Sequence, residues 1–476
     1  KIVFTSIFRP GLGGGAGRVA HELAYNFSLT HDVVMICPAD KTGYGRDENG
    51  LPIYGISSAG DTEFQMPNLS SRTVRNLFDF LDNFQPDIVH AHEPALMGLI
   101  GQVWARMNNV PFVHTTHILP SKAMDFGTSE AIHIPAVLLR NSVSEYAIHS
   151  VLSNFFINCD ALVALNQPAL ESIRDFGYKG PIFVIPNGRS LSHYNQYPFA
   201  DNTTDQKVLV FIGFISDRKN QSYLLKTLRA LPDSYHLRLI GRPLNPDYQK
   251  KLENYCQKHN LTNVEFIGQL DHSKIPDYLA GAHVFPSASK MEVQSLVVIE
   301  ALASGTPVVG LSNETIDELV NEDVGAWLAK DQGPEAFAEQ IQRICDLPAD
   351  QYQKVCQAAR DRVSHLDWSN VVDSTLSAYQ EILKTRPLIT EEKYILLTSL
   401  VNFFTRGDLR DYLLEVIDGS KHRMAAESRF IPRFKVPSPI RPWTRVPSST
   451  WLLSGLTIVV SAIGFIFMKG WGNKKE

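Results

Sequence analysis

The sequence predicts an α/β protein of two doubly wound domains that face each other, and three observations support this fold class. Short apolar runs alternate with helical patterns from the N-terminus to about residue 330, as in parallel sheets that helices cover on both faces. These runs form two series. A polar stretch, Asn187–Asp205, separates one series from the other. We therefore expect one domain at 1–187 and a second domain at 188–366.

Each series of apolar runs supplies the strands of one sheet. Strands that are buried on both faces need no alternation of polar and apolar residues, and runs of this length bounded by turn residues are more typical of strands than of helices. The candidate strands of the first domain are Ile2–Ile7, Val33–Ile36, Ile88–His90, Phe112–His114, Ala161–Ala164 and Phe183–Ile185, and those of the second are Val208–Ile212, His236–Ile240, Val264–Ile267, His283–Phe285 and Val308–Gly310.

Helical patterns continue beyond the second series of strands. Residues 367–384 have the pattern of one long amphipathic helix, and residues 385–428 also have a helical pattern that matches no motif. An insert at 118–158 separates two strands of the first domain and mixes apolar side chains with Lys, Arg and Glu.

The C-terminal region differs sharply in composition from the rest of the chain. Residues 429–449 combine basic side chains with prolines, which break helices, so we expect an extended basic tether on an anionic membrane surface. A solvated linker is the alternative. At 450–468, the uncharged stretch Trp451–Met468 has the length of a bilayer span, and Trp451 and Trp471 bracket it. The sequence thus predicts a single-pass membrane helix, with a buried terminal helix as the alternative.

The overall composition excludes some classes of function. The chain has 476 residues, of which 44% are hydrophobic, so large cores are possible. Its formal net charge of −5 gives no reason to expect nucleic acid as a partner. The five cysteines are scattered without a CxxC pair or a Cys/His cluster, which favours a reducing compartment and indicates no metal site. We expect no signal peptide, since the sequence opens on the strand-like run Ile2–Phe8; a processed or trimmed N-terminus is the alternative, because the sequence lacks an initiator Met.

Two carboxylates, Glu292 and Glu300, are the most informative feature of the sequence. A polar loop carries the first, and a predicted helix that ends at Gly305 carries the second about two turns in. The start of a helix exposes N–H groups that suit a phosphate, and carboxylates beside it suit the vicinal hydroxyls of a ribose and a hexose. The segment 291–309 therefore predicts a nucleotide-sugar site, with an ordinary surface helix as the alternative.

A glycine-rich segment follows the first strand. Gly11–Gly17 precedes a predicted helix, Arg18–Asn26, so its backbone can approach a ligand closely and the helix start favours an anion. The segment also fits a dinucleotide-binding fingerprint, which expects an acid at the end of the second strand. Asp40 comes too late for this role, which weakens the interpretation as an oxidoreductase. A turn needed only for packing is the remaining alternative.

Cations and a histidine complete the candidate site. Gly213 ends a strand, and Arg218 and Lys219 follow in the turn before a helix, where paired cations suit a departing diphosphate. Solvated surface charges are the alternative. Gly241 opens a similar loop after the next strand, and His117 ends a buried strand, where a lone histidine is more often structural. We interpret His90 and His92 as packing groups, and Asn187-Gly188 as a turn between the domains.

The segment from Glu292 to Glu300 resembles the E-x7-E signature of retaining glycosyltransferases of the GT-B fold, family 4 type. Gln294 resembles the Glu-x-Gln form found in glycolipid-forming members, such as diacylglycerol glucosyltransferases. The resemblance covers roughly residues 1–384. It implies two Rossmann-like domains that face a cleft, with the helix at 367–384 crossing back onto the first domain. The expected architecture is therefore this two-domain fold followed by a membrane-anchor helix at the C-terminus.

The resemblance also implies a role for each candidate residue. Glu300 would bind the donor ribose, Glu292 the sugar hydroxyls, and Lys219 with Arg218 the diphosphate. His117 would lie near the anomeric carbon. The implied catalytic residues are His117, Glu292, Arg218 and Lys219; the implied donor-binding residues are Gly13, Gly14, Gly15, Gly213, Arg218, Lys219, Gly241, Glu292, Val293, Gln294, Ser295 and Glu300; and the implied acceptor-side residues are Arg18 and His117.

Two departures from the family pattern are visible in the sequence. Ser295 stands where a glycine is usual, and Phe214 stands where an arginine is usual. Arg218 is the candidate to supply the missing positive charge. The departures motivate one alternative, a non-catalytic scaffold that binds nucleotide sugar at a membrane, whereas the retained Glu292, Glu300 and Lys219 argue against it.

The activity that the resemblance implies is the retaining transfer of a hexose, with glucose as the expected sugar, from a nucleoside diphosphate sugar, most simply UDP-glucose. The expected acceptor is a membrane lipid hydroxyl such as that of diacylglycerol, and the alternatives are a polyprenyl- or inositol-linked lipid or a polysaccharide precursor. The insert at 118–158 would shape the acceptor site, unless it is a plain helical layer. The family requires no bound metal or other cofactor, and nucleotide sugars place the catalytic domains on the cytoplasmic side.

Overall fold

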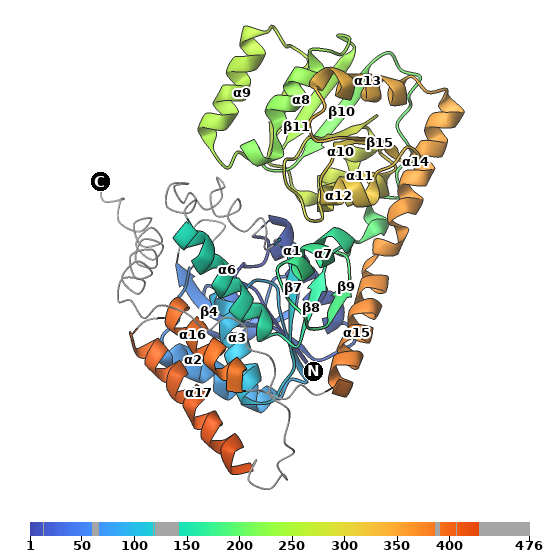
Figure 1. The fold of residues 1–476 in the computed structure, drawn as a ribbon. Helices are drawn as coiled ribbons and strands as arrows, with labels where there is room; N and C mark the ends of the chain where they lie inside the picture. The colour runs from blue at the N-terminus through green and yellow to red at the C-terminus, as the bar shows by residue number, and fades with distance from the viewer. Residues whose placement is uncertain are drawn as a thin grey trace.

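A computed structural model describes residues 1–12, 14–59, 66–117, 119, 142–385, 391–405 and 407–427, which form two lobes. Each lobe has a mainly parallel sheet with helices on both faces, and the first lobe holds the N-terminus (Figure 1). The arrangement of two Rossmann-like lobes confirms the α/β fold class predicted from the apolar runs.

The first lobe contains a sheet of nine strands in the order β3-β4-β2-β1-β6-β7-β8-β9, with β5 paired to β4. All pairs are parallel except those that β4 makes with β3 and β5. The strands are β1 (Ile2–Thr5), β2 (Val33–Ala39), β3 (Gly43–Arg46), β4 (Pro52–Ala59), β5 (Met66–Pro67), β6 (Ile88–Ala91), β7 (Phe112–Thr116), β8 (Ala161–Ala164) and β9 (Ile182–Val184).

Helices cover both faces of this sheet because neighbouring residues of a strand point to opposite sides. Val3 of β1 packs in the cluster that includes Leu77 and Val103, whereas Phe4 packs in the cluster that includes Phe27 and Tyr379. The helices of this lobe that precede the second lobe in sequence are α1 (Gly14–Ser28), α2 (Ser71–Phe84), α3 (Leu96–Met107), α6 (Ser142–Ile157) and α7 (Gln167–Asp175).

The last helices of the chain return to the first lobe. They are α15 (Trp368–Thr385), which packs beside α1, and α16 (Glu391–Phe404) and α17 (Gly407–Glu427), which pack near α2, α3 and α6 (Figure 1). Leu400 and Leu413 are buried in the same cluster as Leu77. The helical region predicted at 385–428 therefore completes the core of the first lobe.

The second lobe carries strands in the order β12-β11-β10 and β13-β14-β15, and a single bridge from Leu209 to Val284 connects β10 with the second group. The strands are β10 (Lys207–Ile212), β11 (Tyr235–Ile240), β12 (Val264–Gly268), β13 (Phe285–Ser287), β14 (Val308–Leu311) and β15 (Gly325–Leu328). The helices are α8 (Gln221–Leu228), α9 (Pro246–Lys258), α10 (Ile275–Ala280), α11 (Leu296–Ser304), α12 (Glu314–Leu319), α13 (Pro334–Cys345) and α14 (Ala349–Val363).

The chain crosses between the lobes twice, and the two crossings are hydrogen-bonded to each other. The N–H of Arg189 donates to the carbonyl of Leu366 at 2.8 Å, and the N–H of Trp368 donates to the carbonyl of Arg189 at 3.2 Å. A Cβ atom on Gly188 would lie 2.2 Å from the indole of Trp368. This position therefore needs glycine, because any side chain would push the crossings apart.

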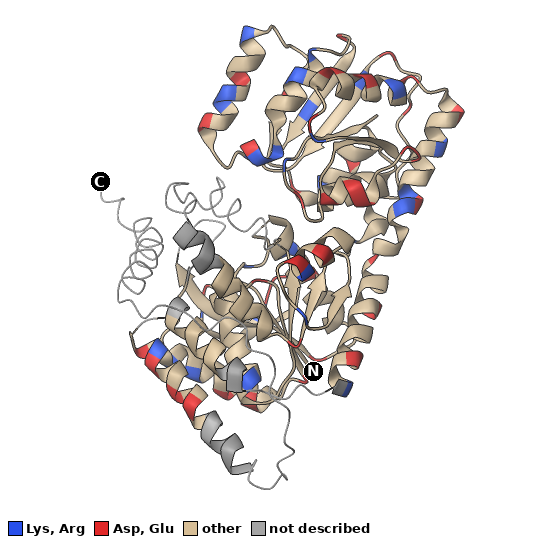
Figure 2. Ribbon diagram, viewed as in Figure 1, with Lys and Arg blue, Asp and Glu red and all other residues tan. Residues whose placement is uncertain are grey.

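The prediction of a single-pass membrane protein is corrected by the structure. Across the ranges that the structure describes, no helix has both the length and the apolar character to cross a bilayer. The predicted tether at 429–449 and span at 450–468 lie outside those ranges. On the described helices of both lobes, Lys and Arg are interspersed with Asp and Glu (Figure 2).

Candidate active site where the lobes meet

The predicted acids lie on and just before α11 of the second lobe. Its backbone begins at Leu296 and ends at Gly305, whose φ of +79° is the left-handed conformation that commonly closes a helix. Ser295 occupies the N-cap, and its N–H donates to Thr315 Oγ1 at 2.8 Å. The end of the helix expected at Gly305 is therefore correct, whereas Glu300 lies about one turn after the start at Leu296 instead of the expected two.

Glu292 is held by a cation from a different strand-to-helix connection. Its Oε1 accepts a hydrogen bond from Nζ of Lys219, which lies in the short 3-10 turn Asp217–Lys219 after β10. Burial opposes the charge of Glu292, but Lys219 and Arg218 lower the pKa of this carboxyl below its usual range. The lowered pKa favours the charged form of Glu292, whose carboxylate faces the Lys219 side chain in the loop that precedes α11.

Glu300 is buried, with a side chain that is 1% exposed, yet it is ionised. Its Oε1 lies 2.5 Å from Nη2 of Arg189, 3.1 Å from Nε2 of His272 and 3.9 Å from Nη1 of Arg18. Burial opposes ionisation, but these groups, led by Arg189, lower the pKa of Glu300 to about 2. The cluster joins both lobes, because Arg18 lies on α1 and His272 follows β12.

The loops that follow β10 and β11 touch each other through glycine backbone. A Cβ atom on Gly241 would lie 2.0 Å from the carbonyl oxygen of Gly213, and both residues have φ near +145° (+144° and +146°). Phe214, which replaces the usual arginine, follows directly. The guanidinium carbon of Arg242 lies 4.9 Å from the centroid of the Phe214 ring, a cation–π contact. The cation beside Phe214 is therefore Arg242, which belongs to the loop that the resemblance places along the nucleotide.

The glycine-rich segment is the first turn of α1 instead of a loop before it. Helix α1 begins at Gly14, four residues earlier than the predicted start at Arg18, while Gly13 lies outside the described residues. A Cβ atom on Gly14 would lie 3.4 Å from Phe214, and one on Gly15 would lie 3.5 Å from Leu296. The N-termini of α1 and α11 thus meet, and both present N–H groups to the same region.

The residues after Glu292 are seated against the first lobe. The carbonyl of Val293 accepts from Asn166 Nδ2 at 2.7 Å. Gln294 is 7% exposed, and its Oε1 accepts from the N–H of Asn187 at 2.6 Å while its Nε2 donates to the Leu165 carbonyl at 3.2 Å. The Gln294 side chain therefore links the lobes, and its contact with a donor stays a prediction.

His117 lies at the end of a stack of buried histidines. Its Nε2 is 2.9 Å from Nδ1 of His92, whose ring stacks on His90, and His90 Nδ1 is 2.5 Å from the Tyr379 hydroxyl. Burial lowers the pKa of His117 to about 4. The imidazoles are therefore neutral near pH 7, and the packing role expected for His90 and His92 agrees with these contacts.

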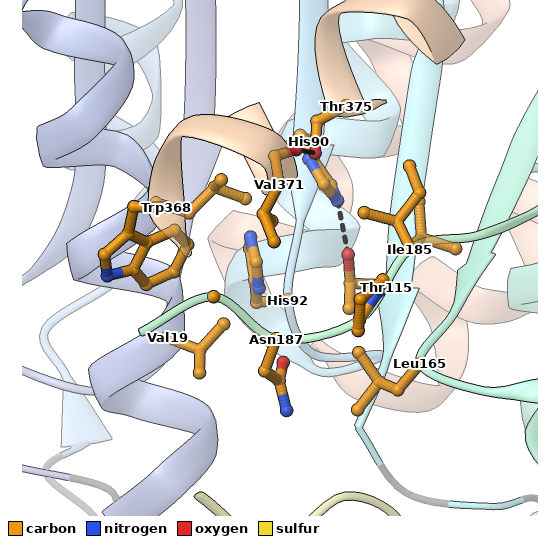
Figure 3. Close-up of a pocket in the computed structure, with 14 residues that line it drawn as sticks. Val19, His90, His92, Thr115, Leu165, Ile185, Asn187, Trp368, Val371 and Thr375 are labelled. Carbon is orange, nitrogen blue, oxygen red and sulfur yellow. Dashed lines mark hydrogen bonds between the residues drawn. The ribbon is translucent and has the colours of Figure 1, made fainter. Parts of the chain in front are cut away.

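His92 also lines a small pocket beside the two crossings. Figure 3 shows His92 between Trp368 and Val371 of α15 and Asn187 of the first crossing. The cavity measures about 20 Å³, room for one water molecule. Within the described part of the chain, His92 Nε2 and Asn187 Oδ1 have no hydrogen-bond partner, so a bridging water would satisfy both.

Sequence reasoning missed Arg189 and His272, although both contact Glu300. Arg189 follows the Asn187-Gly188 turn, and a charged side chain in a linker between domains is ordinarily solvated. Its position in the sequence could have identified it, because a residue directly after a turn between two sheets lies where the two sheets meet. His272 carried no signal, because its loop after β12 matches no motif.

Comparison with protein families accounts for most of the two lobes. The model described as "Glycosyltransferase Family 4" matches residues 13–193, and the model described as "Glycosyl transferases group 1" matches residues 196–362. The division between the two matches falls at the crossing that contains Arg189.

Curated relatives agree with this assignment. The chain is 24% identical over 335 residues to alpha-monoglucosyldiacylglycerol synthase of Streptococcus pneumoniae, a match that spans 67% of this chain and 73% of the relative. It is 26% identical over 402 residues to glycogen synthase of Mycobacterium tuberculosis, a match that spans 78% of this chain and 92% of the relative.

Solved structures show the same fold at low sequence identity. Sucrose-phosphate synthase from Thermosynechococcus elongatus has a TM-score of 0.66 at 20% identity, over 81% of this chain and 99% of its own. Anabaena Alr3699/HepE in complex with UDP-glucose has a TM-score of 0.61 at 18% identity, over 79% of this chain and 99% of its own.

Two Rossmann-like lobes joined by two chain crossings, together with these similar structures, identify the fold as that of the GT-B glycosyltransferases. The chain belongs to the family 4 type of these enzymes.

Proposed function

We propose that this glycosyltransferase moves a hexose, most simply glucose, from UDP-glucose to a lipid hydroxyl such as that of diacylglycerol, with retention of the anomeric configuration. The observation that carries the proposal is the pair Glu292 and Glu300, each ionised by cations at the start of α11. Such a pair can accept hydrogen bonds from two sets of vicinal hydroxyls while the helix start meets the phosphates.

The donor lies across the N-termini of α1 and α11 in this proposal. Glu300 binds the ribose hydroxyls, and Glu292 binds hydroxyls of the hexose with help from the backbone amides of 293–295. Lys219 and Arg218 contact the diphosphate, and Gly14, Gly15, Gly213 and Gly241 allow its close approach. A complex of a GT-B neighbour with UDP-glucose supports this choice of donor.

The reaction is a front-face substitution. The bond between the anomeric carbon and the β-phosphate oxygen breaks, and the acceptor oxygen forms its bond to the same face of that carbon. The acceptor proton passes to the departing phosphate. Catalysis then consists mainly of stabilising the charge that develops on the diphosphate, and the ion pair of Lys219 with Glu292 supports this role for Lys219. Neutral His117 contacts the sugar from the acceptor side together with Arg18.

A lipid acceptor is supported by two features. Gln294 reproduces the Glu-x-Gln form found in glycolipid-forming members, and a relative matched over 67% of this chain is named alpha-monoglucosyldiacylglycerol synthase. A polysaccharide acceptor is the second candidate, because a relative matched over 78% of this chain is named glycogen synthase. The chemistry of the donor site is the same for both acceptors.

The test offers each donor separately to the purified protein. Radiolabelled UDP-glucose, UDP-galactose, UDP-GlcNAc and GDP-mannose are incubated with diacylglycerol in mixed micelles, and in parallel with glycogen. We expect labelled lipid from UDP-glucose, released by an α-glucosidase and resistant to a β-glucosidase. Label on glycogen alone would reassign the acceptor, and a β-linked product would overturn retention. Failure to bind any nucleotide sugar would overturn the donor site itself.

A further inference from the structure

Arg189 joins the two lobes through its side chain as well as its backbone. Its Nη1 donates to Oε2 of Glu22 on α1 at 2.6 Å, and its Nη2 donates to Oε1 of Glu300 on α11 at 2.5 Å. The indole N–H of Trp368 also donates to Oε2 of Glu22 at 3.3 Å. The guanidinium, 3% exposed, therefore lies between a carboxylate of the first lobe and the proposed ribose-binding carboxylate of the second.

Stability alone does not account for this arrangement. A buried ion pair is often no more stable than apolar side chains of the same volume, because both charges must leave water. The Nε–H of Arg189 is also buried without a hydrogen-bond partner in the described ranges, and an unpaired buried donor costs about 1–3 kcal/mol. The buried, unpaired N–H of Arg189 is better explained by an effect of Arg189 on the position of the Glu300 carboxylate.

The cations around Glu300 are not equivalent. His272 is 41% exposed, and Arg18 is 38% exposed with its Nη1 at 3.9 Å. Arg189 is buried, is permanently charged and is tied at its far side to Glu22. All three side chains approach Oε1 of Glu300, and Arg189 is the nearest of them at 2.5 Å. Because Arg189 is also buried and anchored to Glu22, it sets the orientation of the carboxylate.

We propose that Arg189 is a positioning residue for the donor ribose: it fixes Oε1 of Glu300 so that the carboxylate presents Oε2 to the ribose hydroxyls. This inference rests on the proposed function, in which Glu300 binds ribose. Because the same guanidinium is anchored to Glu22, the ribose contact is set by the relative position of the two lobes. Arg189 does not contact the donor, and it acts through Glu300.

The experiment separates positioning from folding by removing the ribose hydroxyls. Calorimetry measures the Kd of UDP and of 2′,3′-dideoxy-UDP for the wild type and for Arg189→Gln. A hydrogen bond to a charged group contributes about 1.5–3 kcal/mol, so we expect Arg189→Gln to weaken UDP about tenfold or more. Binding of the dideoxy analogue should change by less than about twofold, since it has no hydroxyl for Glu300 to hold.

Two further variants make the result decisive. Arg106→Gln removes another buried arginine, whose Nη1 lies 2.8 Å from Asp160 inside the first lobe; it should lower the melting temperature without changing the ratio of the two affinities. Arg189→Lys keeps the charge but cannot reach both carboxylates in a fork geometry. It should therefore show the same selective loss of UDP affinity, but a smaller one. This variant replaces Arg189→Gln in the experiment if Arg189→Gln does not fold.

Each outcome decides the proposal. Selective loss of UDP affinity supports Arg189 as a positioning residue. Equal weakening of UDP and the dideoxy analogue would mean that Arg189 is only structural, while the donor site remains. Absence of UDP binding to the wild type would instead overturn the proposed function, and this inference with it.

Discussion

Single residues in the site work in ionised pairs that hold one another in place. Lys219 and Glu292 lie on different connections of the second lobe, and Lys219 lowers the pKa of the Glu292 carboxyl against the effect of burial. In the proposed function, a donor that enters between them would exchange this contact for its own hydroxyls and phosphates. Removing either partner leaves a half-buried charge uncompensated, which costs more than the pair contributes.

We predict that Glu292→Gln and Lys219→Ala each lower kcat/KM roughly a hundredfold, because each removes a contact that develops with the departing diphosphate or the sugar. Radiolabel transfer to lipid measures this. Lys290→Ala is the matched control, since Lys290 pairs with Asp217 on the same loops but is exposed, and such pairs contribute little. A loss of activity in the control equal to that in the site variants would contradict the assignment.

The buried histidines make the fold sensitive to acid. Burial lowers the pKa of His117 to about 4 and that of His114 to about 3, whereas the unfolded chain titrates near 6.5. The unfolded state therefore binds more protons below about pH 6.5, so the free energy of unfolding falls as the pH falls toward 4.

Urea unfolding at a series of pH values tests this prediction. We expect the midpoint to decline steadily below about pH 6.5, and the decline to be shallower in a His117→Asn variant, because that variant lacks one of the titrating groups. A midpoint that stays constant from neutral pH to about 5 would show that these histidines titrate normally.

At the residue scale, the sequence could identify side chains that belong to a motif and no others. Glu292, Glu300 and Lys219 stand at recognisable spacings, and the structure brings each into a charged cluster. Arg189 could not be identified in the same way, because its importance depends on Glu22 and Glu300, which are distant in sequence and meet only when both lobes are formed.

Elements of the fold are positioned by close backbone contacts as much as by side chains. The loops after β10 and β11 pass each other at Gly213 and Gly241, where a Cβ atom on Gly241 would lie 2.0 Å from the carbonyl oxygen of Gly213. This contact brings the turn that carries Lys219 beside the loop that carries Arg242. The strand ends of a parallel sheet are where ligands bind in such folds, so the glycine contact shapes the donor side of the site.

We predict that Gly241→Ala destabilises the second lobe by at least about 2 kcal/mol, since φ of +144° and a carbonyl at 2.0 Å both oppose a side chain. Thermal unfolding followed by circular dichroism measures the loss. Gly281→Ala is the control, because the nearest atom to its Cβ would be 3.6 Å away. Similar melting temperatures for the two variants would count against the contact.

Helices α16 and α17 lie far along the sequence but belong to the core of the first lobe. We predict that Leu413→Ala, at a fully buried position of α17, lowers the free energy of unfolding by about 3 kcal/mol. Ile395→Ala on α16 is the control, since Ile395 is exposed and its truncation should cost less than about 0.5 kcal/mol. An unchanged denaturation midpoint in Leu413→Ala would show that α17 is not part of this core.

Most elements could be predicted from the sequence because their apolar runs are continuous and buried on both faces. β4 was missed because its residues are only partly buried and it pairs with antiparallel neighbours at β3 and β5. The start of α1 was placed too late, since glycines are ordinarily poor in helices, whereas Gly17 is needed there: its Cβ would lie 2.2 Å from the carbonyl of Leu12.

The whole molecule brings its lobes together through a small number of polar contacts and two chain crossings. These polar contacts are hydrogen bonds across the junction between the lobes. They join Gln294 to Asn187 and Leu165, Val293 to Asn166, and Arg189 to both Glu22 and Glu300. A ligand at this junction touches both lobes at once. Its binding free energy therefore stabilises their relative position as well as the individual elements.

We predict that UDP at about a hundred times its Kd stabilises the folded protein by about 2.7 kcal/mol, seen as a higher melting temperature in calorimetry. Glu300→Gln should lose most of this gain, because the ribose contact is removed. Stabilisation by UDP that is equal in wild type and Glu300→Gln would place the nucleotide elsewhere.

The return of α15, α16 and α17 to the first lobe has a consequence for how the protein is made. A ribosome delivers the nine strands of the first sheet and the helices α1, α2, α3, α6 and α7 early, but three further helices of this lobe, α15, α16 and α17, come only after the last strand of the second lobe, β15. The second lobe can therefore complete its core during synthesis while part of the apolar surface of the first lobe is still uncovered. A chimera that exchanges acceptor specificity must transplant two separate stretches of chain together, because the first lobe is one body encoded in two pieces.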